Sequence, residues 1–256
     1  QDYLLTPDDW EDIAFRSSMR QEYNVSVSGA TDRSTFYASF GYLNNEGITE
    51  NSNMERYTAR LKADYQAKKW LKVGANAGYA NFTYNSLSAD GQENSSANLF
   101  AFTSSVAPIY PLYVRDGQGN IMKNDAGITM YDYGDGMNAG LTRPLLPNAN
   151  GLADSRLNTA RSEGNAFNGT GFFDILFLKD FKFTFNVGVS LDETRRTTVQ
   201  NPYFGQFADE NGIIGKYHTR DFSHSLQQIL NYTKVIGKHN VNVMLGHEYY
   251  QRRQYL

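Results

Sequence analysis

The sequence contains no cysteine among its 256 residues and only 6 prolines. The absence of cysteine excludes a disulfide framework and a thiolate metal site, although it does not identify a cellular compartment. No run of basic residues stands out and the net charge is −3, which argues against a nucleic-acid partner. The chain also lacks an apolar stretch approaching the ~20 residues that a membrane-spanning helix needs.

Aromatic residues and glycine are plentiful by contrast. The chain has 18 Tyr, 16 Phe and 22 Gly, yet its mean hydropathy is −0.56. Aromatic residues favour β-strands, and glycine with few prolines suits tight turns between them. The composition therefore predicts an all-β chain.

Strict alternation of apolar and polar residues supports this prediction. In RYTARLKADYQA, residues 56–67, every second residue from Tyr57 is Tyr, Ala or Leu, and the others are Arg, Thr, Lys, Asp or Gln. FKFTFNVGVSLD, residues 181–192, alternates in the same way. A helix would distribute such residues around its whole surface, so the pattern indicates strands with one uncharged face.

Eight such runs can be counted along the chain. They cover about 22–31, 34–44, 55–67, 70–85, 162–177, 181–200, 217–235 and 240–253. Short and long connections alternate between them, and the longest runs from Ser86 to about Arg161. This is the pattern of an antiparallel meander whose two ends face different environments.

The length of the runs favours a membrane. The run from Phe181 to Gln200 would span roughly 65 Å at ~3.3 Å per residue. Strands of soluble sheets have about 5–6 residues, and a membrane strand needs ~9–11. Aromatic or basic residues such as Tyr65, Trp70 and Phe177 flank the short turns, as in the aromatic girdles of outer-membrane barrels. Periodicity alone does not separate such a barrel from a soluble sandwich.

No catalytic or metal-binding motif stands out, and we expect neither an enzyme nor a cofactor. The four histidines (218, 224, 239 and 247) lack ligand spacing, and no Ser-His-Asp or paired-carboxylate arrangement rises above chance. Asp116 begins DGQGN like a calcium loop, but Gly127 stands where the twelfth-position acid would be. We expect this segment, and likewise the one holding Asp132 and Asp135, to form turns.

Several motifs carry a resemblance to a known family. They are Asp9-Trp10, the NVSVSG of Asn24 to Gly29, the YASFGYLNNEGI of Tyr37 to Ile48, and the RYTAR of Arg56 to Arg60. Together they resemble SusC/RagA-like TonB-dependent outer-membrane transporters, densely over about 55 residues, with weaker echoes at 107–120 and 169–189. Ala30 departs from the family, where a second glycine is common.

The resemblance implies an antiparallel up-and-down transmembrane β-barrel of about 22 strands. It also implies a signal peptide, an accessory domain, a TonB-interacting segment and a plug, none of which we recognise here. We therefore expect a barrel fragment. Residues 1–21 would lead into the barrel, 22–85 and 162–256 would each supply four strands, and 86–161 would form a long extracellular loop.

The same resemblance implies a function and partners. It points to import of glycan oligomers, or peptides in some members, across the outer membrane of a Bacteroidetes-type bacterium. A SusD-like surface lipoprotein would be the lid, and a TonB complex would supply energy through a part missing here. Loops of the family shape the substrate cavity, so Tyr110, Tyr113, Tyr131 and Tyr133 are candidate ligand-stacking residues. Alternatively, they anchor the loop to its neighbours.

Residues 94–106 of the long loop are expected to form a short helix capped by Ser95 or Ser96, with Leu99, Phe100 and Phe102 packing. The charged side chains of the third strand are expected to face the lumen, and the uncharged ones lipid. Two other hypotheses remain open, namely a complete eight-stranded barrel acting as an anchor or adhesin and a soluble carbohydrate-binding β-sandwich.

Overall fold

A computed structural model of the chain describes residues 8–87, 98–138, 140–205 and 207–255. Its strands form one eight-stranded antiparallel sheet in which neighbours in sequence are neighbours in space. The strands are β1 (Arg20–Ala30), β2 (Ser34–Glu46), β3 (Asn53–Lys68), β4 (Leu71–Ser86), β5 (Thr159–Phe177), β6 (Phe181–Gln200), β7 (Ile213–Ile236) and β8 (His239–Tyr255). The predicted meander of long strands is confirmed.

Neither of the two alternative hypotheses, the complete eight-stranded barrel and the soluble β-sandwich, matches this architecture. β1 and β8 are the outermost strands of the sheet and do not pair with each other, so the eight strands do not close into a small barrel. The described strands form one sheet rather than two facing sheets, so the β-sandwich hypothesis is wrong. Phe181, Phe183 and Phe185, which a sandwich would bury, are half-buried.

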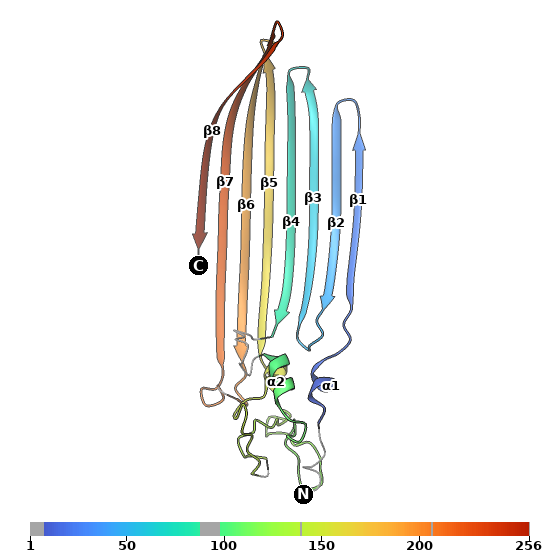
Figure 1. Ribbon diagram of the computed structural model, residues 1–256, viewed down its shortest axis with the longest axis vertical. Helices are drawn as coiled ribbons and strands as arrows, with labels where there is room; N and C mark the ends of the chain where they lie inside the picture. Colours follow the sequence, from blue (N-terminus) through green and yellow to red (C-terminus); the bar gives the residue numbers. More distant parts are fainter. Residues whose placement is uncertain (1–7, 88–97, 139, 206, 256) are drawn as a thin grey trace.

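The two ends of the sheet differ. Short turns join the strands at one end, and the other end carries three longer connections and three short helices (Figure 1). The helices are α1 (Trp10–Ala14), α2 (Leu99–Ser105) and α3 (Gly151–Leu157). We call the described residues of 8–15, 98–158 and 201–212 the loop cap.

The main hydrophobic core lies in the loop cap and not against the sheet. It is built around buried residues of all three helices and of the connection between α2 and α3, namely Trp10, Ala14, Leu99, Phe102, Val106, Leu112, Tyr131, Tyr133, Leu152 and Ala153. Many apolar residues of the strands remain exposed, including Val25, Leu61 and Leu245 at 72%, 62% and 71%. Large exposed apolar surfaces mark contacts with other proteins or with lipid.

The register shows that the two faces of the sheet differ in chemical character. Leu61 of β3 lies beside Ala38 of β2 and Ala77 of β4, whereas the adjacent Lys62 lies beside Tyr37 and Asn76. Paired residues of an antiparallel sheet share a face, so the apolar side chains of successive strands form one continuous surface. We call it the apolar face, and the surface that carries Arg60 and Lys62 the polar face.

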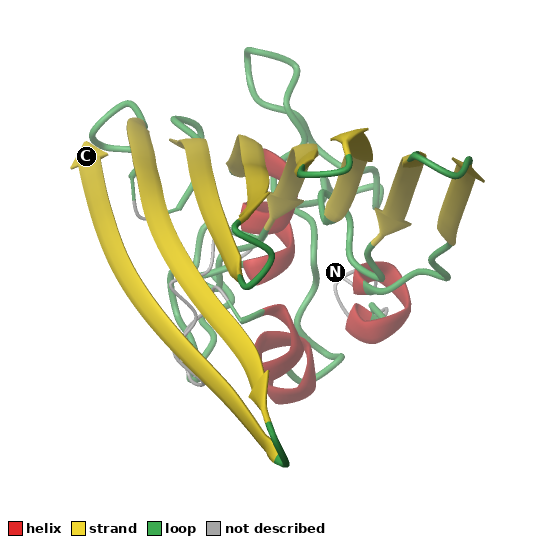
Figure 2. Cartoon of the chain, turned by 90° about the horizontal axis from the view of Figure 1, so that it is seen from above, coloured by secondary structure: helices red, strands yellow, loops and turns green. Residues whose placement is uncertain are grey.

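The polar face is the concave one. Figure 2 shows the helices and most of the loop segments on the inner side of the curved sheet, while a loop projects past its outer side. The strand residues that the cap buries belong to the polar face: Leu43, Ala160 and Ser162 are only 7%, 1% and 3% exposed. Arg161 and Glu163, on the other face of the same strand, are exposed. The apolar face is therefore convex.

The apolar face has the height of a membrane. On β6 it runs from Phe181 through Phe183, Phe185, Val187 and Val189 to Leu191, before Glu193 begins a charged region. Ten residue steps cover about 33 Å, and a strand tilt of ~40° reduces this to about 25 Å, the apolar height of outer-membrane barrels.

Aromatic side chains border this surface at both ends. Near the turns, Phe177 stacks on Phe181 with ring centroids 5.5 Å apart, and Phe181 contacts Tyr232 at 4.8 Å. Toward the cap, the hydroxyls of Tyr42 and Tyr57 both donate to the Glu55 carboxylate, at 3.0 and 2.8 Å. Tyrosine rings have an apolar body and a polar tip, so they suit the interface between the membrane interior and water.

Candidate functional site

The loop cap is held together around Trp10. Its ring meets that of Phe102 edge-on at 5.4 Å, and its indole N–H donates to the Tyr110 carbonyl at 3.0 Å. The α1 helix that carries it is capped by Asp9, whose side chain accepts from the Asp12 amide. The Asp-Trp motif therefore fastens the segment before β1 to the long loop.

The predicted helix in the long loop is present but shorter. α2 begins after Asn98, whose side chain accepts from the Ala101 amide at 3.2 Å, so Asn98 is the cap. Ser95 and Ser96 lie outside the described residues. Leu99 and Phe102 are buried as expected, whereas Phe100 is 55% exposed and stacks on Phe15.

Two of the candidate tyrosines form a pair with each other. Tyr113 and Tyr131 form an antiparallel bridge, and their rings lie 5.3 Å apart. The Tyr113 hydroxyl accepts from the Arg156 guanidinium at 2.8 Å, and that guanidinium also pairs with Glu50 of the β2–β3 connection. Burial raises the pKa of Tyr131, which is only 9% exposed.

Tyr133 is a buried link between the cap's segments. Its hydroxyl donates to the Asp154 carboxylate of α3 at 3.2 Å, and its ring stacks on Phe204 with centroids 6.3 Å apart. Burial raises the pKa of Asp154 to about 6. It also raises the pKa of Tyr133, an effect that the nearby Asp154 carboxylate reinforces.

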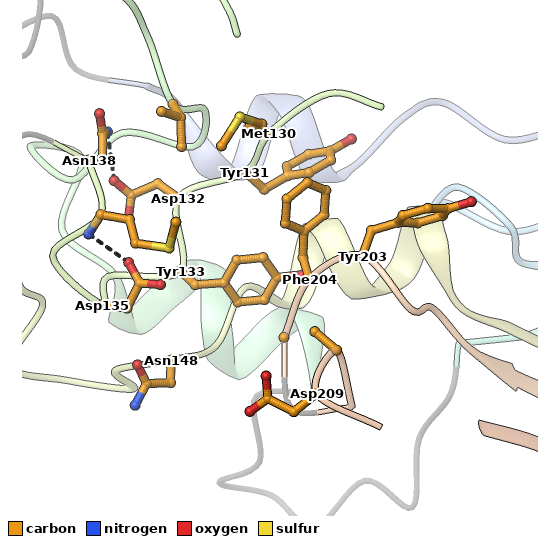
Figure 3. Close-up of a pocket in the computed structure, with 14 residues that line it drawn as sticks. Met130, Tyr131, Asp132, Tyr133, Asp135, Asn138, Asn148, Tyr203, Phe204 and Asp209 are labelled. Atoms are coloured by element: carbon orange, nitrogen blue, oxygen red, sulfur yellow. Dashed lines mark hydrogen bonds between the residues drawn. The ribbon is translucent and has the colours of Figure 1, made fainter. Parts of the chain in front are cut away.

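A cavity of about 300 Å³ opens beside Tyr131 and Tyr133 (Figure 3). One wall is the segment from Met130 to Asn138, and the other is the β6–β7 connection, which supplies Tyr203, Phe204 and Asp209. Arg143 stabilises the backbone around Tyr133. Its side chain is only 2% exposed, and it donates to the carbonyls of Tyr133, Leu145 and Leu146. This volume lies at the lower end of the range for small-ligand sites.

Acidic turns shape the cavity rim. Asp132 accepts from the Gly134 amide at 2.6 Å and from the Asn138 side chain at 2.7 Å, and Asp135 accepts from the Met137 amide. Burial raises the pKa of Asp132. The fourteen lining residues include three aspartates and no Lys, Arg or His. The cavity therefore offers acceptors and aromatic surface, and it disfavours an anionic ligand.

Two of the four predicted site residues lie at the cavity and two do not. Tyr131 and Tyr133 line the cavity, whereas Tyr110 and Tyr113 lie outside its lining and pack within the cap. Tyr203, Phe204 and Asp209 also line the cavity and were not predicted from the sequence. Their signal is the stretch NPYFGQFADENG between two strands, which is rich in aromatic and acidic residues.

Asp116 takes part in a tight turn. Its carboxylate accepts from the amides of Gln118 and Asn120 at 2.8 and 2.9 Å, and these bonds lower its pKa, with the Asn120 side chain contributing most. Within the described ranges, no group of three or more His, Cys, Asp or Glu side chains could hold a metal ion. No described helix is long and apolar enough to cross a membrane.

The fold and its two faces define the class of this chain. It is a segment of an up-and-down transmembrane β-barrel, with an apolar convex face, a polar concave face and a folded loop cap at one end.

Comparison with known proteins narrows the class. No protein-family model matches the sequence. The chain is 26% identical to the TonB-dependent receptor SusC of Bacteroides thetaiotaomicron and 24% identical to the TonB-dependent receptor P3 of Formosa agariphila, over 94% of its length in both cases. It spans 24% and 22% of those two proteins.

A solved structure agrees with these relatives. The RagAB peptide importer in its open-open state superimposes with a TM-score of 0.73 and 25% identity, covering 97% of this chain and 26% of the solved chain. The resemblance to SusC/RagA-like TonB-dependent transporters is thus confirmed over nearly the whole sequence.

Proposed function

We propose that this chain forms part of the wall and the extracellular cap of a TonB-dependent outer-membrane importer. The importer takes up glycan oligomers or peptides, with a SusD-like surface lipoprotein as its lid and a TonB complex as its energy source. The main support is the curved sheet with its apolar convex face, combined with similarity to SusC over 94% of the chain. The RagAB structures, which are of a peptide importer, support the peptide option.

The cavity in the loop cap is proposed to contact the imported ligand. Tyr203, 45% exposed, offers a ring for stacking, and Asp209 offers a carboxylate for which the described part of the chain shows no ion pair or hydrogen bond. Tyr131 and Tyr133 form the inner wall, and Tyr110 and Tyr113 support it through the cap's core. The aspartates select neutral or basic groups over acidic ones.

The first test is the intact mass of the natural polypeptide isolated from outer membranes in detergent. This chain has a mass of 28.9 kDa and spans 24% of SusC, so the proposal expects roughly four times that mass. It also expects a lipoprotein to copurify. A polypeptide of about this chain's own mass in that fraction contradicts the importer.

The second test is uptake of labelled oligosaccharides and peptides by cells that carry pocket variants. Tyr203→Ala and Asp209→Asn are expected to raise the half-saturating ligand concentration about tenfold, equivalent to about 1.4 kcal/mol. Tyr65→Ala is the matched control, because Tyr65 is similarly exposed (49%) but lies beside a short turn at the opposite end of the sheet. Equal losses in all three variants contradict a ligand role for the cavity.

A further inference from the structure

The cavity in the loop cap has mainly apolar and aromatic walls. Four aliphatic and four aromatic side chains line it, together with three aspartates, two asparagines and one glycine. Tyr133 and Phe204 stack at an interplanar angle of 24° in its wall. Met137 and Tyr203, which are 75% and 45% exposed, mark the side that is open to solvent (Figure 3). At about 300 Å³ the cavity admits one residue-sized group of a ligand rather than a whole oligomer.

Several polar groups of the lining already bind other parts of the cap. Asp132 accepts two hydrogen bonds from its own turn, and the Tyr133 hydroxyl donates to a carboxylate of α3. Asp135 accepts one backbone amide, which leaves most of the roughly four acceptor positions of its carboxylate open. The exposed Asp209 carboxylate has no hydrogen bond or ion pair within the described residues. The cavity therefore offers a ligand two carboxylates and few other polar partners.

The cap around the cavity is strongly acidic. It contains eleven Asp and Glu and four Lys and Arg residues, a formal charge of −7, whereas the whole chain carries −3. Arg115 pairs with Asp8 and Arg156 with Glu50. Arg143 is buried and donates to backbone carbonyls, and none of the four basic residues lines the cavity. The field of the cap therefore attracts cations to the cavity and repels anions.

We propose that the cavity binds a lysine or arginine side chain of an imported peptide. Asp209 binds the cationic group, Asp135 adds its charge, and the Tyr203 ring offers its face to the cation. The aliphatic stem of the side chain contacts the apolar walls, including Met130 and Met137. A sugar unit suits these walls less well, because it has no such stem and its hydroxyls need more hydrogen-bond partners. This inference rests on the proposed function and narrows it to basic peptides.

The test uses the natural polypeptide purified from outer membranes in detergent, and three short peptides of glycine and serine that differ at one central position. That position is lysine, norleucine or glutamate, and acetyl and amide groups remove the charges of the peptide ends. Norleucine keeps the carbon stem of lysine without its ammonium group. Titration calorimetry should show the lysine peptide binding about tenfold more tightly than the norleucine peptide. The glutamate peptide should bind most weakly, and added salt should reduce the preference for lysine.

Variants separate the charge from the shape of the cavity. Asp209→Asn should weaken binding of the lysine peptide about fivefold and leave the norleucine peptide unchanged, because only the first loses an ion pair. Tyr203→Ala should weaken binding of both peptides, because each loses contact with the ring. Glu210→Gln is the matched control: Glu210 is the next residue, is exposed and acidic, and lies outside the lining, so its variant should bind like the parent.

Three results would overturn the proposal. They are equal affinity for the lysine and norleucine peptides, an equal loss in Glu210→Gln and Asp209→Asn, and tighter binding of a glucosamine trimer, which carries its ammonium groups on sugars. The proposed function is judged separately by intact mass and by uptake of oligosaccharides and peptides. Uptake without a preference for basic peptides contradicts only the lysine or arginine site, whereas no uptake of either class contradicts the importer and this site together.

Discussion

The contact between Tyr133 and Asp154 shows how a single residue ties cap stability to pH. Burial favours the neutral carboxyl of Asp154 and raises its pKa from 3.8 to about 6. The folded cap therefore binds a proton more tightly than the unfolded chain does. The resulting stabilisation is fully present below about pH 4 and is lost as the pH rises through 6.

Asp154→Asn should remove this dependence. The amide stays neutral and still offers an oxygen to the Tyr133 hydroxyl, so the variant should be more stable than the parent at pH 8, by about 3 kcal/mol at most. Hydrogen exchange of the α3 amides at pH 5 and pH 8, corrected for intrinsic rates, measures the effect. Asp125→Asn, an exposed cap substitution, is the control. Parent protection that does not change between the two pH values would argue against a half-buried Asp154 that binds a proton in the folded cap.

Individual site residues were only partly predictable. Tyr131 and Tyr133 belong to a conspicuous group of loop tyrosines, and the cavity uses both. Tyr203 and Asp209 lie some seventy residues further along the chain, and only the packing of two loops brings them to the same cavity. No periodicity or residue spacing in the sequence indicates that these two loops are in contact.

At the scale of elements, α2 owes its place to the burial of one face. Phe102 is fully buried and contacts both the Trp10 ring and the Arg143 guanidinium, whereas Phe100 of the same helix is 55% exposed. Phe102→Ala should destabilise the cap by about 3–5 kcal/mol. Limited proteolysis should then cleave between β4 and β5 far faster than in the parent.

Phe100→Ala is the comparison within the same helix. It removes a ring of the same size that is mostly exposed and stacks on Phe15, so we expect a loss of about 1 kcal/mol and near-parental proteolysis. If the two variants are cut equally fast, the helix is not anchored through Phe102.

Strands were easier to predict than helices, for a physical reason. In this sheet, successive side chains of a strand alternate between two environments over ten or more positions. This alternation is visible in the sequence as a repeat of apolar and polar residues. β5 begins at Thr159, earlier than the predicted 162, because the cap buries its polar face there and blurs the alternation. β7 begins at Ile213, earlier than the predicted 217, because the adjacent Ile213 and Ile214 are both apolar and both exposed, which breaks the alternation. α3 was missed because seven residues capped by Asn150 carry too little periodicity.

At the scale of the whole molecule, the sheet separates two solvents. Val187 lies in the middle of the apolar face and Asn186, its neighbour, on the polar face. Val187→Arg should cost about 2–4 kcal/mol in the membrane and reduce the amount of protein assembled in outer membranes. Asn186→Arg places the same charge at the same height in the lumen, and its assembly should stay near the parental level.

Quantitative blotting of outer-membrane fractions measures this pair of variants. The reverse order, with Asn186→Arg assembling less well, would mean that the two faces of the sheet have been assigned to the wrong solvents.

The most direct test of that assignment is a scan of lipid exposure along β6 in the natural polypeptide, reconstituted in bilayers. Single cysteines from Phe181 to Leu191 carry a spin label, and relaxation by oxygen and by a water-soluble nickel chelate is compared at each position. We predict strict alternation, with the odd-numbered positions exposed to oxygen and the even-numbered ones to the chelate. Equal accessibility at neighbouring positions, or the opposite phase, would contradict a barrel wall with its convex face in lipid.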